Sequence, residues 1–304
     1  MNRSVDARHQ PGFNSGSGVA AGLQPGTGSV SIGEVLRLST EHLAAKGSDT
    51  PRLDAERLLA KAIGLERIEL YTAFDRPLTQ PELAAARELV ARRARREPLQ
   101  YVLGEWGFRH LTLTVDRRAL IPRPETEILV ERALALVAGL ERPRVLDVGT
   151  GSGAIALAIA DEHPGAVVTG LDSSEDALGL AAENVARTGL AVELAVHDLF
   201  EGLPDGPWDL VVSNPPYVDA ADLAGLQPEV REWEPHGALS AEGAVEAVAR
   251  GAVAVLAPGG ALVVEVGAGQ TDATAALFHE LGFAGVRMTR DLAGHDRVVE
   301  GRRT

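Results

Sequence analysis

Hydrophobic residues recur every three or four positions over residues 31–104, a spacing typical of helices that bury one face. Ser31 with Glu34, and Thr79 with Glu82, match the capping boxes that begin helices. This pattern carries no repeat and no obvious chemistry. We therefore predict that these residues form a small helical domain.

The pattern changes to alternation over residues 105–121. Leu111, Leu113 and Val115 alternate there with polar residues. A period of two is typical of strands with one buried face. We expect a β-hairpin that links the helical domain to the rest of the chain.

From residue 122 to the end, strand-like and helix-like patterns alternate. The strand-like segments are RVLDVG (144–149), AVVTGLD (166–172), VELAVH (192–197), DLVVSN (209–214) and ALVVEVG (261–267). Such alternation is typical of a parallel sheet with helices on both faces, so residues 122–304 are expected to form a Rossmann-like α/β domain. Residues 286–291 and 296–301 predict a closing hairpin.

Charge and hydropathy restrict the partners. The 29 Lys and Arg residues against 43 Asp and Glu residues give a net charge of −14, which argues against broad binding to nucleic acid. No apolar run approaches the ~20 residues that a membrane span needs. We therefore expect a cytoplasmic protein with no direct nucleic-acid partner and no membrane partner.

Residue usage adds further limits. The chain has no Cys, which excludes disulfides and Cys-ligated zinc, and its 8 His residues show no metal-ligand spacing, so no metal is expected. Residues 1–30 are rich in Gly, Ser and Gln and predict a disordered tail. The basic run at residues 92–96 predicts a solvent-exposed helix end, with contact to an acidic protein as the alternative.

A glycine-rich turn follows the first strand of the α/β domain. It comprises Gly149, Thr150, Gly151, Ser152 and Gly153. Glycine is needed where a backbone turns sharply or lies against a ligand, and the helix that follows directs free N–H groups to the same place. Asp172 ends the next strand, where a carboxylate can accept hydrogen bonds from both hydroxyls of a ribose. The sequence therefore predicts a nucleoside-binding site.

The turn by itself leaves the cofactor open. Gly149, Gly151 and Ala154 also fit the relaxed dinucleotide fingerprint. Asp147 favours S-adenosylmethionine, because a carboxylate just before the glycines can hold the cationic amino-acid end of that cofactor and would repel a pyrophosphate.

The segment Asn214-Pro215-Pro216-Tyr217 directly follows a strand. Pro216 lacks an N–H group and keeps Pro215 extended, so the Pro215 carbonyl has no helix or turn partner. The side chain of Asn214 places a second carbonyl beside it. A planar NH₂ group has two donors that match these acceptors, and Tyr217 can stack on its flat face. The segment therefore predicts a substrate-binding site for a planar amine or amide.

This arrangement suits methyl transfer to a carboxamide. An amide nitrogen is a poor nucleophile because its lone pair is delocalised. Two hydrogen bonds from its N–H groups would localise charge on the nitrogen and aim it at a methyl group, and such positioning supplies ~7–11 kcal/mol of a barrier. No general base is needed, since the methylated nitrogen sheds its proton to water. We predict Asn214, Pro215 and Tyr217 as the catalytic residues.

Three alternatives remain open at this point. An N6-adenine or N4-cytosine methyltransferase uses a related (Asp/Asn)-Pro-Pro-(aromatic) segment, although the acidic balance of this chain argues against one. A nicotinamide oxidoreductase would use the relaxed fingerprint but leaves the Asn-Pro-Pro-Tyr segment unexplained. A cofactor-binding module without activity is the third.

From about residue 31 to its end, the chain resembles the HemK/PrmC protein-(glutamine-N5) methyltransferases. The segments that carry the resemblance are EPLQYVLGEWGF (97–108), LIPRPETE (120–127), VLDVGTGSG (145–153), SNPPYV (213–218), PEVREWEP (228–235) and DLAGHDRVV (291–299). The resemblance implies a class I S-adenosylmethionine-dependent methyltransferase. It also implies that the substrate is the glutamine of the Gly-Gly-Gln motif in class-I peptide chain release factors, which the helical domain helps to grip.

The resemblance assigns roles residue by residue. Gly149–Gly153 would hold the methionine part of the cofactor and Asp172 its ribose, while Asp198 and Leu199 would flank the adenine. Asn214 would contact both the cofactor and the acceptor amide. The rest of the Asn-Pro-Pro-Tyr segment would complete the amide site.

Other family segments carry weaker implications. Phe108 and Arg123 lie in segments that line the cofactor site in the family. We expect capping and hinge roles for Glu125 and Glu127, since the reaction needs no acid–base pair. Residues 239–244 depart from the family's usual glycine-containing loop, on the substrate side.

Overall fold

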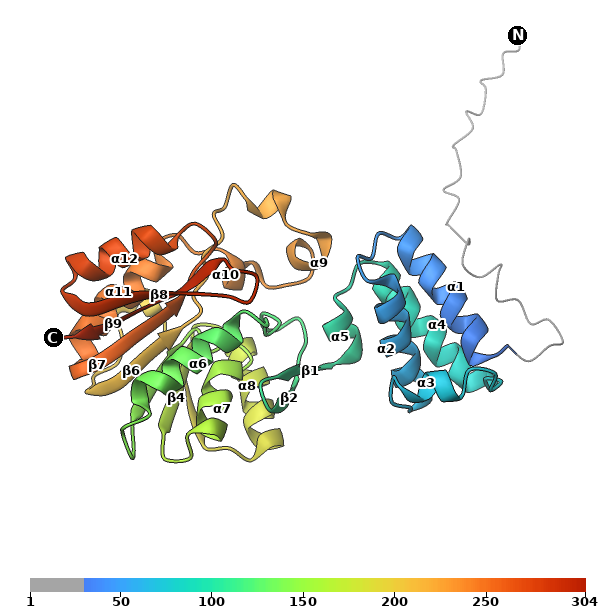
Figure 1. Cartoon of the computed structure of the whole chain (residues 1–304), viewed down its shortest axis with the longest axis horizontal. Coiled ribbons are helices and arrows are strands. Elements are labelled where there is room, and N and C mark those ends of the chain that lie inside the picture. Colours follow the sequence, from blue (N-terminus) through green and yellow to red (C-terminus); the bar gives the residue numbers. More distant parts are fainter. Residues whose placement is uncertain (1–29) are drawn as a thin grey trace, which may run out of the picture. The chain divides into compact units, whose positions relative to one another are not determined.

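The computed structural model describes residues 30–304. All of the predicted disordered tail except Val30 lies outside the described residues. Contacts divide the chain into two units, with the division after Arg95 (Figure 1). The second unit therefore begins ahead of the predicted boundary at residue 104.

The first unit is helical, as the periodicity predicts. Its helices are α1 (Ile32–Ala45), α2 (Pro51–Ile63), α3 (Glu69–Thr72) and α4 (Gln80–Ala94). Ser31 caps α1 by accepting from the backbone N–H of Glu34, and the reciprocal capping box of Thr79 and Glu82 is complete at α4. Both predicted helix starts are confirmed.

The basic end of α4 is only partly exposed. Arg93 is buried and its Nε lies 2.7 Å from Oδ2 of Asp54 on α2. The predicted solvent-exposed helix end is therefore wrong at Arg93. The physical reason is that a buried carboxylate needs a cationic partner, and only the packing of α4 on α2 brings the two together.

The second unit is built on a seven-stranded sheet of order β5-β4-β3-β6-β7-β9-β8. The strands are β3 (Arg144–Val148), β4 (Val167–Asp172), β5 (Val192–Val196), β6 (Trp208–Ser213), β7 (Leu256–Glu265), β8 (Phe283–Arg290) and β9 (Asp296–Arg303). The first five in spatial order are parallel, and β9 pairs antiparallel with both β7 and β8. The parallel sheet and the closing hairpin are both confirmed.

Helices cover both faces of this sheet (Figure 1). The helices of eight residues or more are α6 (Thr126–Val137), α7 (Ala154–Glu162), α8 (Glu175–Thr188), α11 (Ala244–Val255) and α12 (Thr271–Glu280). Shorter ones are α5 (Leu99–Leu103), η1 (Leu199–Glu201), η2 (Leu223–Gly225), α9 (Pro228–Arg231) and α10 (His236–Leu239). One apolar cluster lies between the sheet and α6 and α7, and a second lies between the sheet and α11 and α12.

The predicted hairpin, β1 (Glu105–Phe108) and β2 (Leu111–Thr114), packs into the second unit. Phe108 and Leu113 belong to the apolar cluster under α6 and α7. The buried amide of Asn184 on α8 exchanges two hydrogen bonds with the backbone of Thr114 and donates a third to the Ser152 carbonyl. The hairpin is thus part of the α/β core rather than a free connection.

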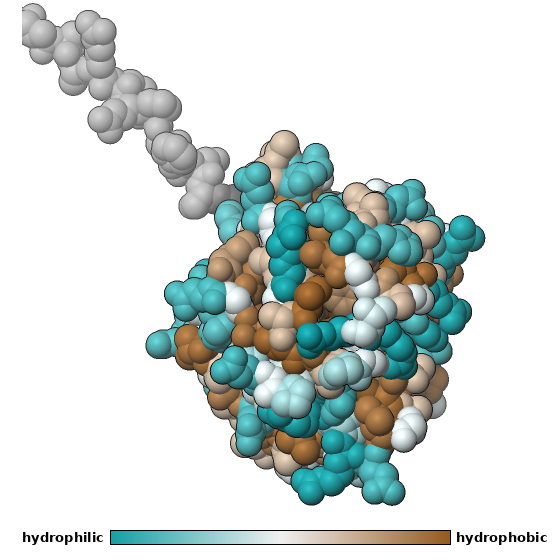
Figure 2. Space-filling model, turned by 90° about the vertical axis from the view of Figure 1, so that its left-hand side faces the viewer, coloured by the Kyte–Doolittle hydropathy of each residue, from teal (hydrophilic) through white to brown (hydrophobic). Residues whose placement is uncertain are grey.

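No helix within residues 30–304 combines the length and the apolarity that crossing a bilayer requires. Figure 2 views the molecule from the side on which the C-terminus lies in Figure 1. Hydrophobic residues (brown) on this face are interrupted by hydrophilic ones (teal).

Replacing Asn184 with alanine is expected to lower the free energy of unfolding by about 2–4 kcal/mol, because backbone groups of Thr114 and Ser152 lose their partners. Arg187 on the same helix forms an exposed ion pair with Glu105, and its replacement should lower the free energy of unfolding by less than about 1 kcal/mol. Urea unfolding measures both. Equal losses would show that the Asn184 bridge matters no more than a surface contact.

Candidate functional site

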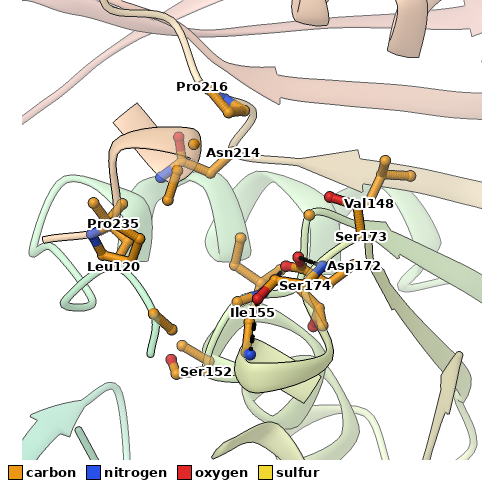
Figure 3. Close-up of a pocket in the computed structure, with 18 of the residues that line it drawn as sticks. Leu120, Val148, Ser152, Ile155, Asp172, Ser173, Ser174, Asn214, Pro216 and Pro235 are labelled. Atoms are coloured by element: carbon orange, nitrogen blue, oxygen red, sulfur yellow. Dashed lines mark hydrogen bonds between the residues drawn. The ribbon is translucent and has the colours of Figure 1, made fainter. Parts of the chain in front are cut away.

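A cavity of about 390 Å³ opens where β3, β4 and β6 end (Figure 3). This volume lies within the range of sites for small molecules and cofactors. The predicted site residues that line it are Gly149, Thr150, Gly151, Ser152, Asp172, Asp198, Leu199, Asn214 and Pro216. Gly153, Pro215 and Tyr217 lie outside the lining. The fold thus gathers most of the predicted residues around one space.

The glycine-rich turn forms one wall of the cavity. Gly149 and Gly151 adopt φ values of +75° and +56°, which only glycine reaches without strain. The N–H groups of Gly149 and Thr150 both donate to the carbonyl of Leu171, at 2.8 Å. These bonds tie the turn to β4 and keep its backbone exposed to the cavity.

Asp172 stands at the end of β4 on the cavity wall (Figure 3). Its Oδ2 accepts from the N–H of Gly151 and its Oδ1 from the N–H of Ser174, both at 2.9 Å. The two bonds hold the carboxylate in one orientation. Each oxygen retains a lone pair for a ligand hydroxyl, which suits a ribose.

Asp147 is fully buried and does not line the cavity. Its Oδ2 accepts from the Thr150 hydroxyl at 2.6 Å and from the Ala156 N–H at 3.2 Å, while Oδ1 has no partner among the described residues. Burial raises the pKa of Asp147 to about 7, and these hydrogen bonds oppose the rise. Asp147 thus joins the turn to α7, instead of the predicted direct contact with a ligand.

Asn214 follows β6 and lies across the cavity from α7, the helix that follows the glycine-rich turn (Figure 3). Its Nδ2 donates to Oγ1 of Thr126, 3.2 Å away at the start of α6. Within residues 30–304 no group donates to its Oδ1. Just before it, the Ser213 hydroxyl donates to the Val148 carbonyl at 2.6 Å and ties β6 to β3. The side-chain amide is therefore held by its nitrogen and keeps its oxygen available.

Tyr217 is anchored from the side of β7. Its carbonyl accepts from Nε2 of Gln270 at 3.0 Å, and Oε1 of Gln270 accepts from the Gly267 N–H at 2.9 Å. Its hydroxyl lies 3.5 Å from Oε1 of Glu265. Burial raises the pKa of Tyr217 to about 12, so the phenol stays neutral. These contacts fix the Asn-Pro-Pro-Tyr segment at both of its ends.

A buried carboxylate organises another part of the wall. Glu234 pairs with Arg123 and accepts from the Ile121 N–H at 3.2 Å. Burial raises the pKa of Glu234, and Arg123 opposes that rise. Arg123, Pro235 and the segment that follows it line the cavity. The ion pair therefore ties residues 228–235 to the start of the α/β domain.

The remaining implied residues lie elsewhere. Phe108 is buried in the core and does not line the cavity. Glu125 occupies the N-cap position of α6, but its side chain makes no capping hydrogen bond there. Glu127 accepts from the backbone N–H of Arg109 in the hairpin turn, at 3.1 Å. It fixes the hairpin against α6 rather than capping the helix.

Three residues that contact the site were not predicted from the sequence, namely Thr126, Glu265 and Gln270. Their partners are distant in the chain, so no local spacing reveals them. The available signal was Glu265, which is a lone carboxylate in the otherwise apolar segment ALVVEVG.

The donor set fits S-adenosylmethionine. The turn lines the cavity, and Asp172 offers oriented acceptors for ribose hydroxyls. Asp198, whose side chain accepts from the Phe200 N–H at 3.0 Å, lines the far end together with Leu199.

Two family models match the chain. The model described as PrmC N-terminal domain matches residues 34–104, and the model described as methyltransferase small domain matches residues 125–227. Between them they cover the helical unit and most of the cavity wall.

Curated relatives match over most of their length. The release factor glutamine methyltransferase of Geobacter sulfurreducens is 46% identical over 275 residues, which are 89% of this chain and 96% of the relative. The protein of that name from Cereibacter sphaeroides is 45% identical over 279 residues, which are 88% and 97% of the two chains.

Among solved structures, the 16S rRNA N2 G1207 methyltransferase of T. thermophilus, in complex with AdoMet and guanosine, is similar in fold. The TM-score is 0.50 at 21% identity, over 66% of this chain and 50% of that one. The likeness confirms the predicted class I methyltransferase fold.

Asp172→Asn is expected to weaken binding of S-adenosylhomocysteine at least about tenfold, because an amide has one acceptor oxygen where the carboxylate has two. Glu175→Gln removes a neighbouring carboxylate that does not line the cavity, and affinity should stay within about twofold. Isothermal titration calorimetry compares the two. Equal weakening would mean that net charge, rather than the carboxylate at 172, controls binding.

Proposed function

We propose that this chain, which belongs to the family of release factor glutamine methyltransferases, methylates the side-chain amide nitrogen (N5) of the glutamine in the Gly-Gly-Gln motif of class-I peptide chain release factors. The family uses S-adenosylmethionine as methyl donor. Relatives above 40% identity over nearly their whole length support the same reaction here.

Family membership also decides between the alternatives that the residues left open. Because the family consists of methyltransferases, the cofactor at the glycine-rich turn is a methyl donor instead of a nicotinamide cofactor. The relatives are named for a protein substrate, which removes the basis for a nucleic-acid substrate. The net charge of −14 points the same way.

The cofactor would lie between the turn and the ends of β4 and β5. Gly149–Gly153 would hold its methionine part, Asp172 its ribose, and Asp198 with Leu199 its adenine. When bound, it supplies an electrophilic methyl group on a sulfonium. The chain's own contribution is to hold that group against the end of β6.

The acceptor amide would be held by the Asn-Pro-Pro-Tyr segment. Oδ1 of Asn214 and the carbonyl of Pro215 would accept its two N–H groups, Pro216 would shape the pocket, and Tyr217 would pack on the amide plane. The observation that carries this proposal is the orientation of Asn214. Its nitrogen is already engaged by Thr126, so its oxygen is the group left for a substrate.

Two carbonyl acceptors would turn a poor nucleophile into a usable one. Hydrogen bonds from both N–H groups draw charge onto the nitrogen and fix its direction of approach. Positioning of this kind supplies ~7–11 kcal/mol of a barrier. No general base is required, because the methylated nitrogen loses its proton readily to water.

A release factor as substrate implies a partner in translation, and we place the protein in the cytoplasm on that ground. The contact would be with a protein surface and not with a membrane. The helical unit, which matches the PrmC N-terminal domain, is the part that we assign to gripping the release factor.

Asn214→Ala is expected to lower kcat toward a purified class-I release factor at least about 100-fold, because one of the two acceptors is lost. Binding of S-adenosylhomocysteine should stay within about threefold, since the turn and Asp172 are untouched. Asp205→Ala, in an exposed loop before β6, serves as the control with wild-type kcat.

The measurement is transfer of labelled methyl, followed by peptide mapping of the modified glutamine. Wild-type turnover by the Asn214 variant would refute the role of that side chain. Label on any residue other than the glutamine of the Gly-Gly-Gln motif would refute the proposed substrate.

A further inference from the structure

Glu265 is a buried carboxylate that the proposed reaction does not use. It ends β7, whose preceding residues Ala261–Val264 are fully buried and apolar, and it is itself 1% exposed. Its Oε1 faces the Tyr217 hydroxyl at 3.5 Å, and Oε2 has no hydrogen-bond partner among the described residues. Burying a carboxylate is costly, and the sheet gains nothing from it. A function in the neighbouring site would account for it.

Thr126 connects this carboxyl group to the site. Its side chain lowers the pKa of Glu265, which places the two groups close together, and its hydroxyl accepts from Nδ2 of Asn214 at 3.2 Å. The proton of that hydroxyl needs an acceptor of its own, and Oε2 of Glu265, which has no partner among the described residues, is a neighbouring one. Thr126 is buried at the start of α6, so water does not compete for its hydroxyl. Three elements that are distant in sequence therefore meet in one chain of polar groups, from the end of β7 through α6 to the end of β6.

The chain of groups has a fixed direction when Glu265 is ionised. A carboxylate can only accept, so it takes the single proton of the Thr126 hydroxyl. The lone pairs of that hydroxyl are then left to accept from Asn214, which must present its nitrogen. The carbonyl oxygen of Asn214 consequently faces the cavity, as the acceptor that a substrate N–H requires.

We propose that Glu265 and Thr126 are positioning residues that set the orientation of the Asn214 side-chain amide, so that its oxygen and not its nitrogen meets the substrate carboxamide. This inference rests on the proposed function of Asn214. Without the relay, either end of the amide could face the substrate. The reversed orientation would set an NH₂ group against the substrate's own NH₂ group and abolish one of its two hydrogen bonds.

The relay makes the orientation sensitive to pH. The groups that face Glu265 are Thr126 on α6, Tyr217 after β6, Arg297 on β9 and Glu125 before α6. Burial is the largest influence and raises the pKa of Glu265 to about 7, although Thr126, Arg297 and Tyr217 oppose the rise. A protonated Glu265 can donate as well as accept, so the proton of the Thr126 hydroxyl is then no longer held toward Glu265. The ordered state is the ionised one, so it is lost as pH falls through about 7.

Glu265→Gln tests the relay with almost no change of shape. The new NH₂ group can donate to Thr126, whose proton can then turn to Asn214 and reverse the amide. We expect kcat toward a release factor to fall at least about tenfold, with the dissociation constant of S-adenosylhomocysteine within about twofold of wild type. The rise of kcat between about pH 6 and 8 should disappear in this variant, because the group that titrates is gone.

Thr126→Val removes the hydroxyl with its shape preserved and should lose about as much kcat as Glu265→Gln, whereas Thr126→Ser should stay within about twofold of wild type. Thr274→Val is the matched control. Thr274 is also a buried helical threonine, but its hydroxyl donates to the Gln270 carbonyl within α12. Its kcat and pH profile should be those of wild type. Thermal unfolding and cofactor binding report whether each variant is folded.

A double-mutant comparison shows whether the relay acts through Asn214. Adding Thr126→Val to Asn214→Ala should cause no further loss of kcat, since the amide to be oriented is absent. Full additivity of the two losses would overturn the proposal. So would wild-type kcat and an unchanged pH profile in Glu265→Gln. In either of those cases, a low kcat for Asn214→Ala alone would leave the proposed role of Asn214 standing, whereas wild-type kcat for Asn214→Ala would refute that role, and only the site of the label tests the proposed substrate.

Discussion

Parallel pairing of β3 with β4 on one side and with β6 on the other is the constraint on which the site depends. Val148 is in register with Leu171 of β4 and with Ser213 of β6. The three strands therefore end at one edge of the sheet, where Gly149 follows β3, Asp172 ends β4 and Asn214 follows β6. A shift of register by one residue would turn these side chains to the other face and separate them. Ligand sites of open α/β sheets form at this edge for the same reason.

The same edge holds buried polar groups that a sheet core would otherwise exclude. Asp147 and Glu265 each have one oxygen without a partner among the described residues, and burial raises both of their pKa values. Burying such groups costs free energy wherever they are incompletely paired. Each carboxyl group has a threonine of the site beside it: Asp147 accepts from the Thr150 hydroxyl in the turn, and Thr126, which accepts from Asn214, lowers the pKa of Glu265. A hydroxyl can both donate and accept. When it donates its proton to a carboxylate, only its lone pairs remain, so it accepts a hydrogen bond from the group on its other side.

Elements whose buried face follows a regular period were predictable. The helical unit, the parallel strands and the closing hairpin of β8 and β9 all follow such a pattern, and capping residues marked the start of α1 and α4. The division of contacts after Arg95 was not predictable, because it depends on where side chains pack. Tyr101 donates its hydroxyl to the Ala119 carbonyl and packs with Val115 and Ile121, which places α5 and the β1–β2 hairpin with the α/β unit. No local pattern records that preference.

The sequence by itself determined the class of the site. Glycines of the turn, Asp172 and the Asn-Pro-Pro-Tyr segment each carry their chemistry in residue type and short-range spacing. Only the tertiary structure decided which groups hold them in place. The contact of Asn214 with Thr126 joins residues 88 positions apart, and that of Tyr217 with Glu265 joins residues 48 apart. Hydrogen bonds depend on distance and direction in space, and a chain sets those for distant residues only when its core is packed.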